Sequence, residues 1–256
     1  MSSNQRPMNW LLLRGLARDQ RHWMQFGTIF EERMPGSRVF MLDLPGMGNQ
    51  NQRLSPLTVP GIVNDLRHRW KQIDHDFGGP WGILAVSLGG MVAMDWCDRY
   101  AYDFQKLVLV NSSSGGVSHP LRRLQPPMIA EFLKVAKAGS AREKERTILG
   151  FNSNIRSAQD PSIEDAWAQF AEESPNKILN IARQIIAGTQ YRAPKTLMAR
   201  TLVLSALNDH LTHPSCSWDL ARRFGSALAF HDTAGHDLPM DAPEWLVDQV
   251  RYWMND

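Results

Sequence analysis

The sequence predicts an α/β fold in which a mostly parallel sheet of about six strands has helices on both faces. Short apolar runs alternate with amphipathic stretches along most of the 256 residues. The runs are continuous in Leu, Val and Ile, a pattern typical of strands that are buried on both faces. Strands that alternate with helices indicate a parallel sheet, because each crossover between parallel strands has room for a helix.

Six apolar runs predict the strands, at residues 9–15, 38–46, 81–87, 106–114, 201–209 and 227–233. Amphipathic stretches predict helices between or after them, at residues 19–34, 59–73, 88–101, 213–224 and 242–254. Their apolar residues recur at helical spacing, so one side of each helix is expected to cover the sheet.

Residues 115–198 break this alternation. Four helix-like segments fill the region, separated by Gly, Ser, Asn and Pro, and no run in it reads as a strand; the segments are 127–139, 141–151, 162–174 and 176–188. We therefore expect a helical insertion at 115–198 on a core formed by residues 1–114 and 199–256.

Composition excludes several classes of partner. The formal net charge is +2, and no basic patch points to nucleic acid. Cys97 and Cys216 are far apart, which favours two reduced structural thiols in a cytoplasmic protein. No leader-like segment opens the chain, and no apolar run reaches about 18 residues, so neither secretion nor a membrane span is expected. His210 and His213 have a spacing that suits a metal, but no third ligand accompanies them. The sequence leaves open whether the protein forms a homodimer.

The motif ILAVSLGG places Ser87 at the end of the third predicted strand and the start of a helix. A serine on such a sharp turn needs small neighbours, and Ala85, Gly89 and Gly90 provide them. The turn would expose the hydroxyl as a nucleophile, with the N–H of Leu88 at the helix N-terminus placed to stabilise an oxyanion. The alternative is a buried serine that caps the helix beside glycines needed for packing.

A nucleophilic serine needs a base and an acid that orients the base. Asp209 follows the fifth predicted strand and His236 follows the sixth, so both belong at the carboxyl edge of the sheet with Ser87. Other carboxylates compete with Asp209, but they are too close in sequence to His236 to reach the back of its ring easily: Asp232, Asp237 and Asp241.

These motifs together resemble the α/β-hydrolase family over nearly the whole chain. AVSLGG resembles the nucleophile elbow, NDHL the acid turn and AGHDLPMDAPE the histidine loop. LLLRGLARDQRHW resembles the first loop of the family and LDLPGMGNQ its next turn. The insertion at 115–198 stands where the family carries its cap, and only eight residues precede the first strand. We therefore expect an α/β-hydrolase fold with a helical cap but without an antiparallel hairpin at its start.

Two positions depart from the family pattern. Ala85 replaces a glycine, and Arg14 stands beside Gly15 where a histidine is common. The resemblance implies a second oxyanion donor in the first loop, a backbone N–H that we assign to Leu16. Arg14 would either brace this loop or pair with a carboxylate of the substrate. Some family members carry the acid after the fourth strand, where this chain reads VNSSS and has no carboxylate.

The resemblance implies acyl transfer through a Ser87, Asp209 and His236 triad, with no metal and no organic cofactor required. A serine excludes the branches that use a carboxylate nucleophile, such as haloalkane dehalogenases and epoxide hydrolases. We favour a carboxylesterase acting on a small-molecule ester; a thioesterase, an acyltransferase and a carbon–carbon bond hydrolase share the triad. A non-catalytic binding protein of the same fold is the alternative from another class. Apolar cap residues would suit an apolar substrate group, or would simply be the packing face of the cap: Met128, Phe132 and Trp167.

Overall fold

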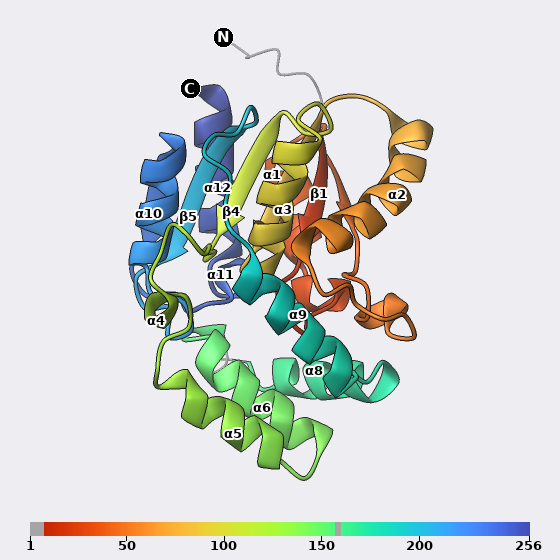
Figure 1. Cartoon of the computed structure of the whole chain (residues 1–256), viewed down its shortest axis with the longest axis vertical. Coiled ribbons are helices and arrows are strands. Elements are labelled where there is room, and N and C mark those ends of the chain that lie inside the picture. The colour runs from red at the N-terminus through yellow and green to blue at the C-terminus, as the bar shows by residue number, and fades with distance from the viewer. Residues whose placement is uncertain (1–7, 157–159) are drawn as a thin grey trace.

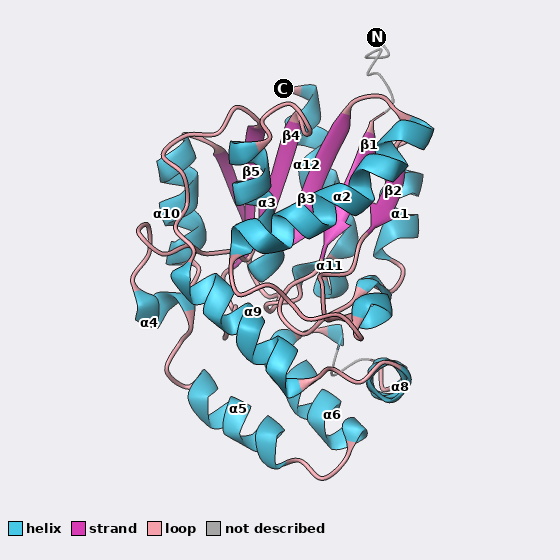
Figure 2. Ribbon diagram, turned by 45° about the vertical axis from the view of Figure 1, so that its right-hand side comes forward, coloured by secondary structure: helices cyan, strands magenta, loops and turns pink. Residues whose placement is uncertain are grey.

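The computed structural model describes residues 8–156 and 160–256. A parallel six-stranded sheet forms its centre, in the order β2-β1-β3-β4-β5-β6 (Figures 1 and 2). The predicted fold class and strand number are confirmed. The strands are β1 (Asn9–Leu13), β2 (Arg38–Met41), β3 (Trp81–Val86), β4 (Lys106–Val110), β5 (Arg200–Ala206) and β6 (Ala227–His231).

The strand order reverses direction beside β1, because β2 is added on one side of β1 and β3 on the other. Such a reversal opens a crevice at the carboxyl ends of the two strands, where α/β proteins commonly bind ligands. Leu13 at the end of β1 pairs with Ala85 of β3. The register therefore brings the loop that begins at Arg14 next to Ser87.

Helices cover both faces of the sheet, which explains the continuous apolar runs in its strands. Alternate residues of one strand face opposite sides: Leu11 and Leu13 enter one core, whereas Trp10 and Leu12 enter the other. The first core includes α2 (Val59–Phe77), α3 (Leu88–Arg99) and α10 (Ser215–Phe224), and the second includes α1 (Phe26–Arg33) and α12 (Pro243–Asn255). None of the helices in the described residues is long and apolar enough to cross a membrane.

Helices also fill the interval between β4 and β5, which we call the cap segment and define as residues 115–198. They lie beyond the carboxyl edge of the sheet (Figures 1 and 2). Apart from one isolated bridge between Gly115 and Arg192, no β structure occurs in the described part of the segment. The helices are α4 (Pro120–Arg123), α5 (Met128–Lys137), α6 (Ala141–Asn152), α8 (Ser162–Glu173) and α9 (Ile178–Gln190).

Helix α9 turns its polar side chains toward the protein. Asn180 and Gln184 are fully buried, whereas Ile178 is 85% exposed and Leu179 is 57% exposed. The Oδ1 atom of Asn180 accepts a hydrogen bond from the N–H of Ser55 over 3.0 Å. Hydrogen bonds to loop backbone therefore help to attach the helix to the core. Ile178 and Leu179 point outward, whereas Ala187 is buried in the core and Ile181 packs against it.

The prediction of one continuous helix at 19–34 is wrong. The segment is split into a 3-10 turn, Gln20–Trp23, and α1, because Met24 adopts a positive φ of 48° between them. Three short elements were not predicted: α4, α11 (Leu238–Asp241) and the 3-10 turn Gly48–Gln50. Each has four residues or fewer, too few for helical periodicity to appear in the sequence.

Candidate active site

Ser87 lies between β3 and α3 in a conformation that L-residues rarely adopt, with φ 56° and ψ −120°. Its N–H donates a hydrogen bond to the carbonyl of Val110 over 2.9 Å. A Cβ atom added to Gly89 would lie 2.6 Å from the carbonyl oxygen of Arg14, and one added to Gly90 would overlap Ser112. The glycines after Ser87 are therefore needed because strand, loop and helix approach one another closely.

The loop after β1 passes directly beside this serine. A Cβ atom added to Gly15 would lie 3.0 Å from Cβ and 3.5 Å from Oγ of Ser87. Leu16, one of the two predicted donors, follows Gly15. The other, Leu88, is the first residue of α3, where a backbone N–H has no acceptor within the helix. Both predicted donors thus belong to segments that flank the Ser87 hydroxyl. We call residues 14–18 the oxyanion loop, after the donor role that the sequence predicts for Leu16.

Asp209 and His236 form a buried pair at the carboxyl ends of β5 and β6. Nδ1 of His236 lies 2.7 Å from Oδ2 of Asp209, and the two residues are 6% and 4% exposed. The other carboxylate oxygen accepts hydrogen bonds from the N–H groups of Leu211 and Thr212 over 2.8 and 2.9 Å. Because Oδ2 can only accept, Nδ1 carries the proton and Nε2 is left as the basic nitrogen.

The backbone of His236 is fixed by Asn111, the residue after β4. Nδ2 of Asn111 donates to the carbonyl oxygens of Gly235 and His236 over 3.2 and 2.8 Å. Its Oδ1 accepts from the N–H of Ala206 at the end of β5 over 2.8 Å. Asn111 has a positive φ of 45° and is 1% exposed. From the sequence we noted only that this position lacks a carboxylate. The signal that would have indicated Asn111 is an amide side chain directly after the end of a buried strand.

Comparison with known proteins shows the family. A family model described as the alpha/beta hydrolase family matches residues 10–249. The chain belongs to the alpha/beta hydrolase family. Among solved structures, it resembles the 2-hydroxy-6-oxo-6-phenylhexa-2,4-dienoate hydrolase of Rhodococcus sp. strain RHA1, with a TM-score of 0.78 and 18% identity over 98% of this chain and 92% of that one.

A thermophilic esterase from Thermogutta terrifontis has a TM-score of 0.72 and 19% identity over 98% of this chain and 90% of the esterase. At such identities the likeness concerns the fold alone. A poly(3-hydroxyalkanoate) depolymerase of Ectopseudomonas oleovorans is 24% identical over 135 residues, which are 48% of this chain and 47% of the depolymerase. The chain thus matches about half the length of that relative.

In this α/β hydrolase the residue after His236 is engaged by the oxyanion loop. Nη1 of Arg14 donates to Oδ1 of Asp237 over 3.0 Å, and Nη2 donates to Oδ2. The side chains of Arg14 and Asp237 are 5% and 3% exposed. The Arg14 guanidinium also lies over the ring of Trp23, with 4.9 Å from Cζ to the ring centroid. Asp237 is therefore committed to Arg14 and does not compete with Asp209 for the imidazole.

Asp241 connects the histidine loop of this hydrolase to the cap segment. Its carboxylate accepts hydrogen bonds from the N–H of Gly235 over 2.7 Å and from the N–H of Asn154 over 2.9 Å. The hydroxyl of Ser153 donates to the same carboxylate. The carbonyl of Asn152 accepts from the N–H of Asp237 over 2.7 Å. The cap segment is thus hydrogen-bonded to Asp237, the residue after His236, and to Asp241, which also holds Gly235.

A second contact joins the cap segment to the loop after β1. Arg18 donates to Glu145 of α6 over 2.8 Å and stacks over Trp167 of α8, with 4.5 Å from Cζ to the ring centroid. His22 lies 3.0 Å from Arg18 through its Nε2 atom and packs edge-on against Trp167. Burial, and then the nearby charge of Arg18, lowers the pKa of His22 to about 4.

The three cap residues predicted to bind substrate have different environments. Trp167 is fully buried in this cap contact, and Met128 is 6% exposed. Phe132 is half-buried and packs edge-on against Phe151, with the ring centroids 5.7 Å apart. Of the three, Phe132 leaves the most surface for a ligand to contact.

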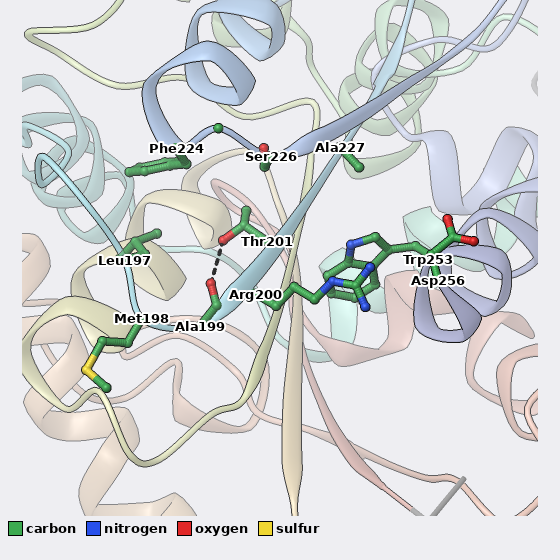
Figure 3. Close-up of a pocket in the computed structure, with 11 residues that line it drawn as sticks. Leu197, Met198, Ala199, Arg200, Thr201, Phe224, Ser226, Ala227, Trp253 and Asp256 are labelled. Carbon is green, nitrogen blue, oxygen red and sulfur yellow. Dashed lines mark hydrogen bonds between the residues drawn. The ribbon is translucent and has the colours of Figure 1, made fainter. Parts of the chain in front are cut away.

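The cavity in Figure 3 lies away from this site. It measures about 380 Å³ and is lined by residues at the start of β5 and the end of α12, among them Arg200, Thr201 and Trp253. These residues are at the amino edge of the sheet, whereas Ser87 and Asp209 follow the carboxyl ends of their strands. The cavity is thus on the opposite edge from the candidate triad.

Proposed function

We propose that this α/β hydrolase cleaves a small-molecule ester through an acyl-enzyme, with Ser87 as nucleophile, His236 as base and Asp209 as the acid that orients the base. The observation that carries the proposal is the buried 2.7 Å contact between His236 and Asp209 at the sheet edge where Ser87 takes up its strained turn. Two buried ionisable side chains paired in this way support Nε2 as a base at the same edge of the sheet as the candidate nucleophile.

In the first half of the proposed reaction, Nε2 of His236 accepts the proton of Ser87 as Oγ attacks the ester carbonyl. The negative charge that develops on the carbonyl oxygen is stabilised by the N–H groups of Leu16 and Leu88. Asp209 stabilises the imidazolium without taking its proton. The imidazolium then protonates the leaving alcohol, and the acyl group remains on Ser87.

In the second half, a water molecule loses a proton to Nε2 and attacks the acyl-enzyme. The tetrahedral intermediate collapses, the proton returns to Ser87 and the carboxylic acid leaves. An apolar acyl or alcohol group is the class of substrate that we propose, because the cap segment presents apolar side chains such as Phe132, Ile129 and Leu133, of which the last two are 58% and 56% exposed. A solved structure of the same fold is named an esterase, which supports an ester as the bond that is cleaved.

Covalent labelling tests the nucleophile. A fluorophosphonate probe is expected to label the wild type at Ser87 and to leave Ser87→Ala unlabelled, with peptide mass spectrometry locating the adduct. Ser217→Ala is the matched control, because Ser217 is 1% exposed and its hydroxyl has no hydrogen-bond partner. Equal labelling of wild type and Ser87→Ala would refute the assignment and would favour a non-catalytic binding protein.

Turnover of a substrate panel tests the bond that is cleaved. Acyl esters of increasing chain length are expected to be hydrolysed faster than matched thioesters. A clear preference for thioesters, for transfer of the acyl group to an alcohol, or for a carbon–carbon bond in a diketone would assign the same triad to the corresponding activity instead.

A further inference from the structure

Arg14 and Asp237 join two loops that the proposed reaction needs in a fixed relation. Arg14 is two residues before Leu16, whose N–H is a proposed oxyanion donor, and Asp237 is the residue after His236. The side chains meet in a paired, two-point contact between a guanidinium and a carboxylate, with 3.0 Å from Nη1 to Oδ1. Such a contact fixes direction as well as distance, since both N–H groups and both oxygens lie in defined planes.

We propose that Arg14 and Asp237 act as a positioning pair that holds the Leu16 N–H and the His236 imidazole in register for the same substrate carbonyl. This inference rests on the proposed function, since it assigns a role to residues around that triad. Neither side chain touches the reacting atoms in the proposal: Arg14 acts through Leu16, and Asp237 acts through His236.

The surroundings of Arg14 argue against a role in binding a carboxylate of the substrate. Both of its terminal nitrogens donate to Asp237, and its charge is therefore already compensated. One face of the guanidinium is covered by Trp23, and the residue as a whole is 5% exposed. A substrate carboxylate would have to displace a buried ion, which leaves an uncompensated charge and is strongly unfavourable.

Other contacts hold the histidine loop against different parts of the protein. The contact between Arg14 and Asp237 therefore has a separate role. Asn111 ties the backbone of His236 to the ends of β4 and β5, and Asp241 ties Gly235 to the cap segment. The contact between Arg14 and Asp237 adds the link to the oxyanion loop. Loss of this link should therefore impair acylation more than it impairs substrate binding.

The pair also has an electrostatic consequence that a purely structural contact would lack. In the described residues, the charged side chains that contact the histidine loop from other elements are Asp209 from the loop after β5 and Arg14 from the loop after β1, and Asp241 of α11 accepts from Gly235 within the loop. Removal of the Arg14 charge leaves the Asp237 carboxylate uncompensated beside His236, which favours the imidazolium over the neutral ring. Removal of the Asp237 charge has the opposite effect.

The kinetic test compares Arg14→Lys and Asp237→Asn with wild type. Lysine keeps the charge but offers a single ammonium in place of the planar pair of N–H donors. We expect each variant to lower kcat, and the rate of fluorophosphonate labelling at Ser87, by roughly 10- to 30-fold, with KM changed less than about threefold, since a small displacement of reacting groups costs rate. A wild-type kcat in Arg14→Lys, or a loss confined to KM, would overturn the inference.

Arg67→Lys is the matched control. Arg67 also forms a two-point contact with a carboxylate, Asp103, over 2.6 and 3.1 Å, but at the amino edge of the sheet. We expect Arg67→Lys to keep the wild-type kcat per folded molecule, with folding monitored by circular dichroism. An equal loss of kcat in Arg67→Lys would mean that the effect reports general stability, and would refute a positioning role for Arg14.

The pH profile of kcat/KM supplies the second readout. Arg14→Met should move the lower apparent pKa upward and Asp237→Asn should move it downward, each by roughly half to one unit. The double variant Arg14→Met with Asp237→Leu should return it close to the wild-type value. Shifts in the same direction, or none in variants with reduced kcat, would contradict the proposal. Ser87→Ala separates the two hypotheses. If the fluorophosphonate labels Ser87→Ala as it labels the wild type, the proposed function fails. If Ser87→Ala is unlabelled but Arg14→Lys is fully active, only the positioning pair is refuted.

Discussion

The side-chain amide of Asn111 donates a hydrogen bond to the carbonyl oxygen of His236 over 2.8 Å, across 125 positions of the sequence. The same amide donates to Gly235 and accepts from the N–H of Ala206. Asn111 therefore uses both of its polar atoms to hold the backbone of the histidine loop against the strand that precedes Asp209. The geometry of the proposed triad depends on this buried amide as well as on the three side chains themselves.

Asn111→Asp is expected to lower kcat by roughly 10- to 100-fold. The new carboxylate could still accept from Ala206, but it cannot donate to the two carbonyl oxygens and would repel them, a loss of buried hydrogen bonding worth about 2–3 kcal/mol. Steady-state kinetics and thermal unfolding would measure both effects. Asn208→Asp is the control, because the exposed Asn208 also donates to a loop carbonyl, that of Asp232. Similar losses in both variants would contradict a specific role for Asn111.

Asp209→Asn is expected to reduce turnover by roughly 10³–10⁴-fold, since an amide at this position removes the charge that stabilises the imidazolium and can reverse the tautomer. The turnover of the variant and of the wild type should be compared at a pH above the lower apparent pKa of kcat/KM. Asp232→Asn should leave turnover within about a factor of three, because Asp209 already occupies the contact with Nδ1 of His236. A full loss in Asp232→Asn with an active Asp209→Asn would move the acid to the histidine loop.

Asp241→Asn is expected to destabilise the protein by about 2–3 kcal/mol. The carboxylate accepts from Gly235, Asn154 and Ser153, and an amide cannot accept through both of its atoms. The free energy of unfolding in urea measures the loss. Asp160→Asn offers a control, because Asp160 accepts from the N–H and hydroxyl of Ser162 at an exposed position. An unchanged free energy in Asp241→Asn would show that the cap segment is held mainly by other contacts.

The buried His22 leads to a prediction about how the stability of the fold changes at acidic pH. The Arg18 guanidinium can only donate, so Nε2 of His22 accepts in this contact, and Nδ1 lies 3.2 Å both from the backbone nitrogen and from the carboxylate of Asp19. Burial, and then the charge of Arg18 against a protonated ring, explains why the pKa of His22 falls to about 4. In the unfolded chain the pKa returns to about 6.5. The neutral imidazole therefore stabilises the fold fully above pH 6.5, and this contribution declines as pH falls toward 4.

The pH dependence of unfolding should accordingly differ between wild type and His22→Gln. Between pH 7 and pH 4 the wild type is expected to lose up to about 3 kcal/mol that the glutamine variant does not lose, because glutamine does not titrate. Urea unfolding at half-unit steps of pH measures the difference. His75→Gln, at an exposed position on α2, should follow the wild-type curve. Parallel curves for wild type and His22→Gln would refute the assignment.

The sequence predicted the sheet well because its strands are buried on both faces. Each predicted strand begins within one residue of the observed one, but the predictions run too far at the carboxyl ends. At β4, for example, the ladder ends at Val110, whereas the prediction continued to residue 114. Apolar and small residues persist past the sheet edge there, because the loops that follow are themselves buried.

The candidate triad could be read from the sequence because each member follows a recognisable strand. The partners that hold it could not. Arg14 and Asp237 are 223 positions apart, and neither local pattern nor composition indicates that they meet. Helix α9 shows the same limit: its buried side includes Asn180 and Gln184 because these side chains bind loop backbone, and hydrophobic periodicity does not indicate such polar contacts.

The positive φ of Ser87 destabilises the folded state, and contacts elsewhere in the protein must offset this loss. Glycine adopts such a conformation without a steric penalty, so Ser87→Gly should unfold at a higher temperature than Ser87→Ala, although both lack the hydroxyl. At this position selection for thermal tolerance alone would favour glycine over serine. Under the proposed function, serine at this position gives up thermal stability in exchange for a reactive hydroxyl, and engineering of a more stable variant should therefore begin elsewhere in the chain.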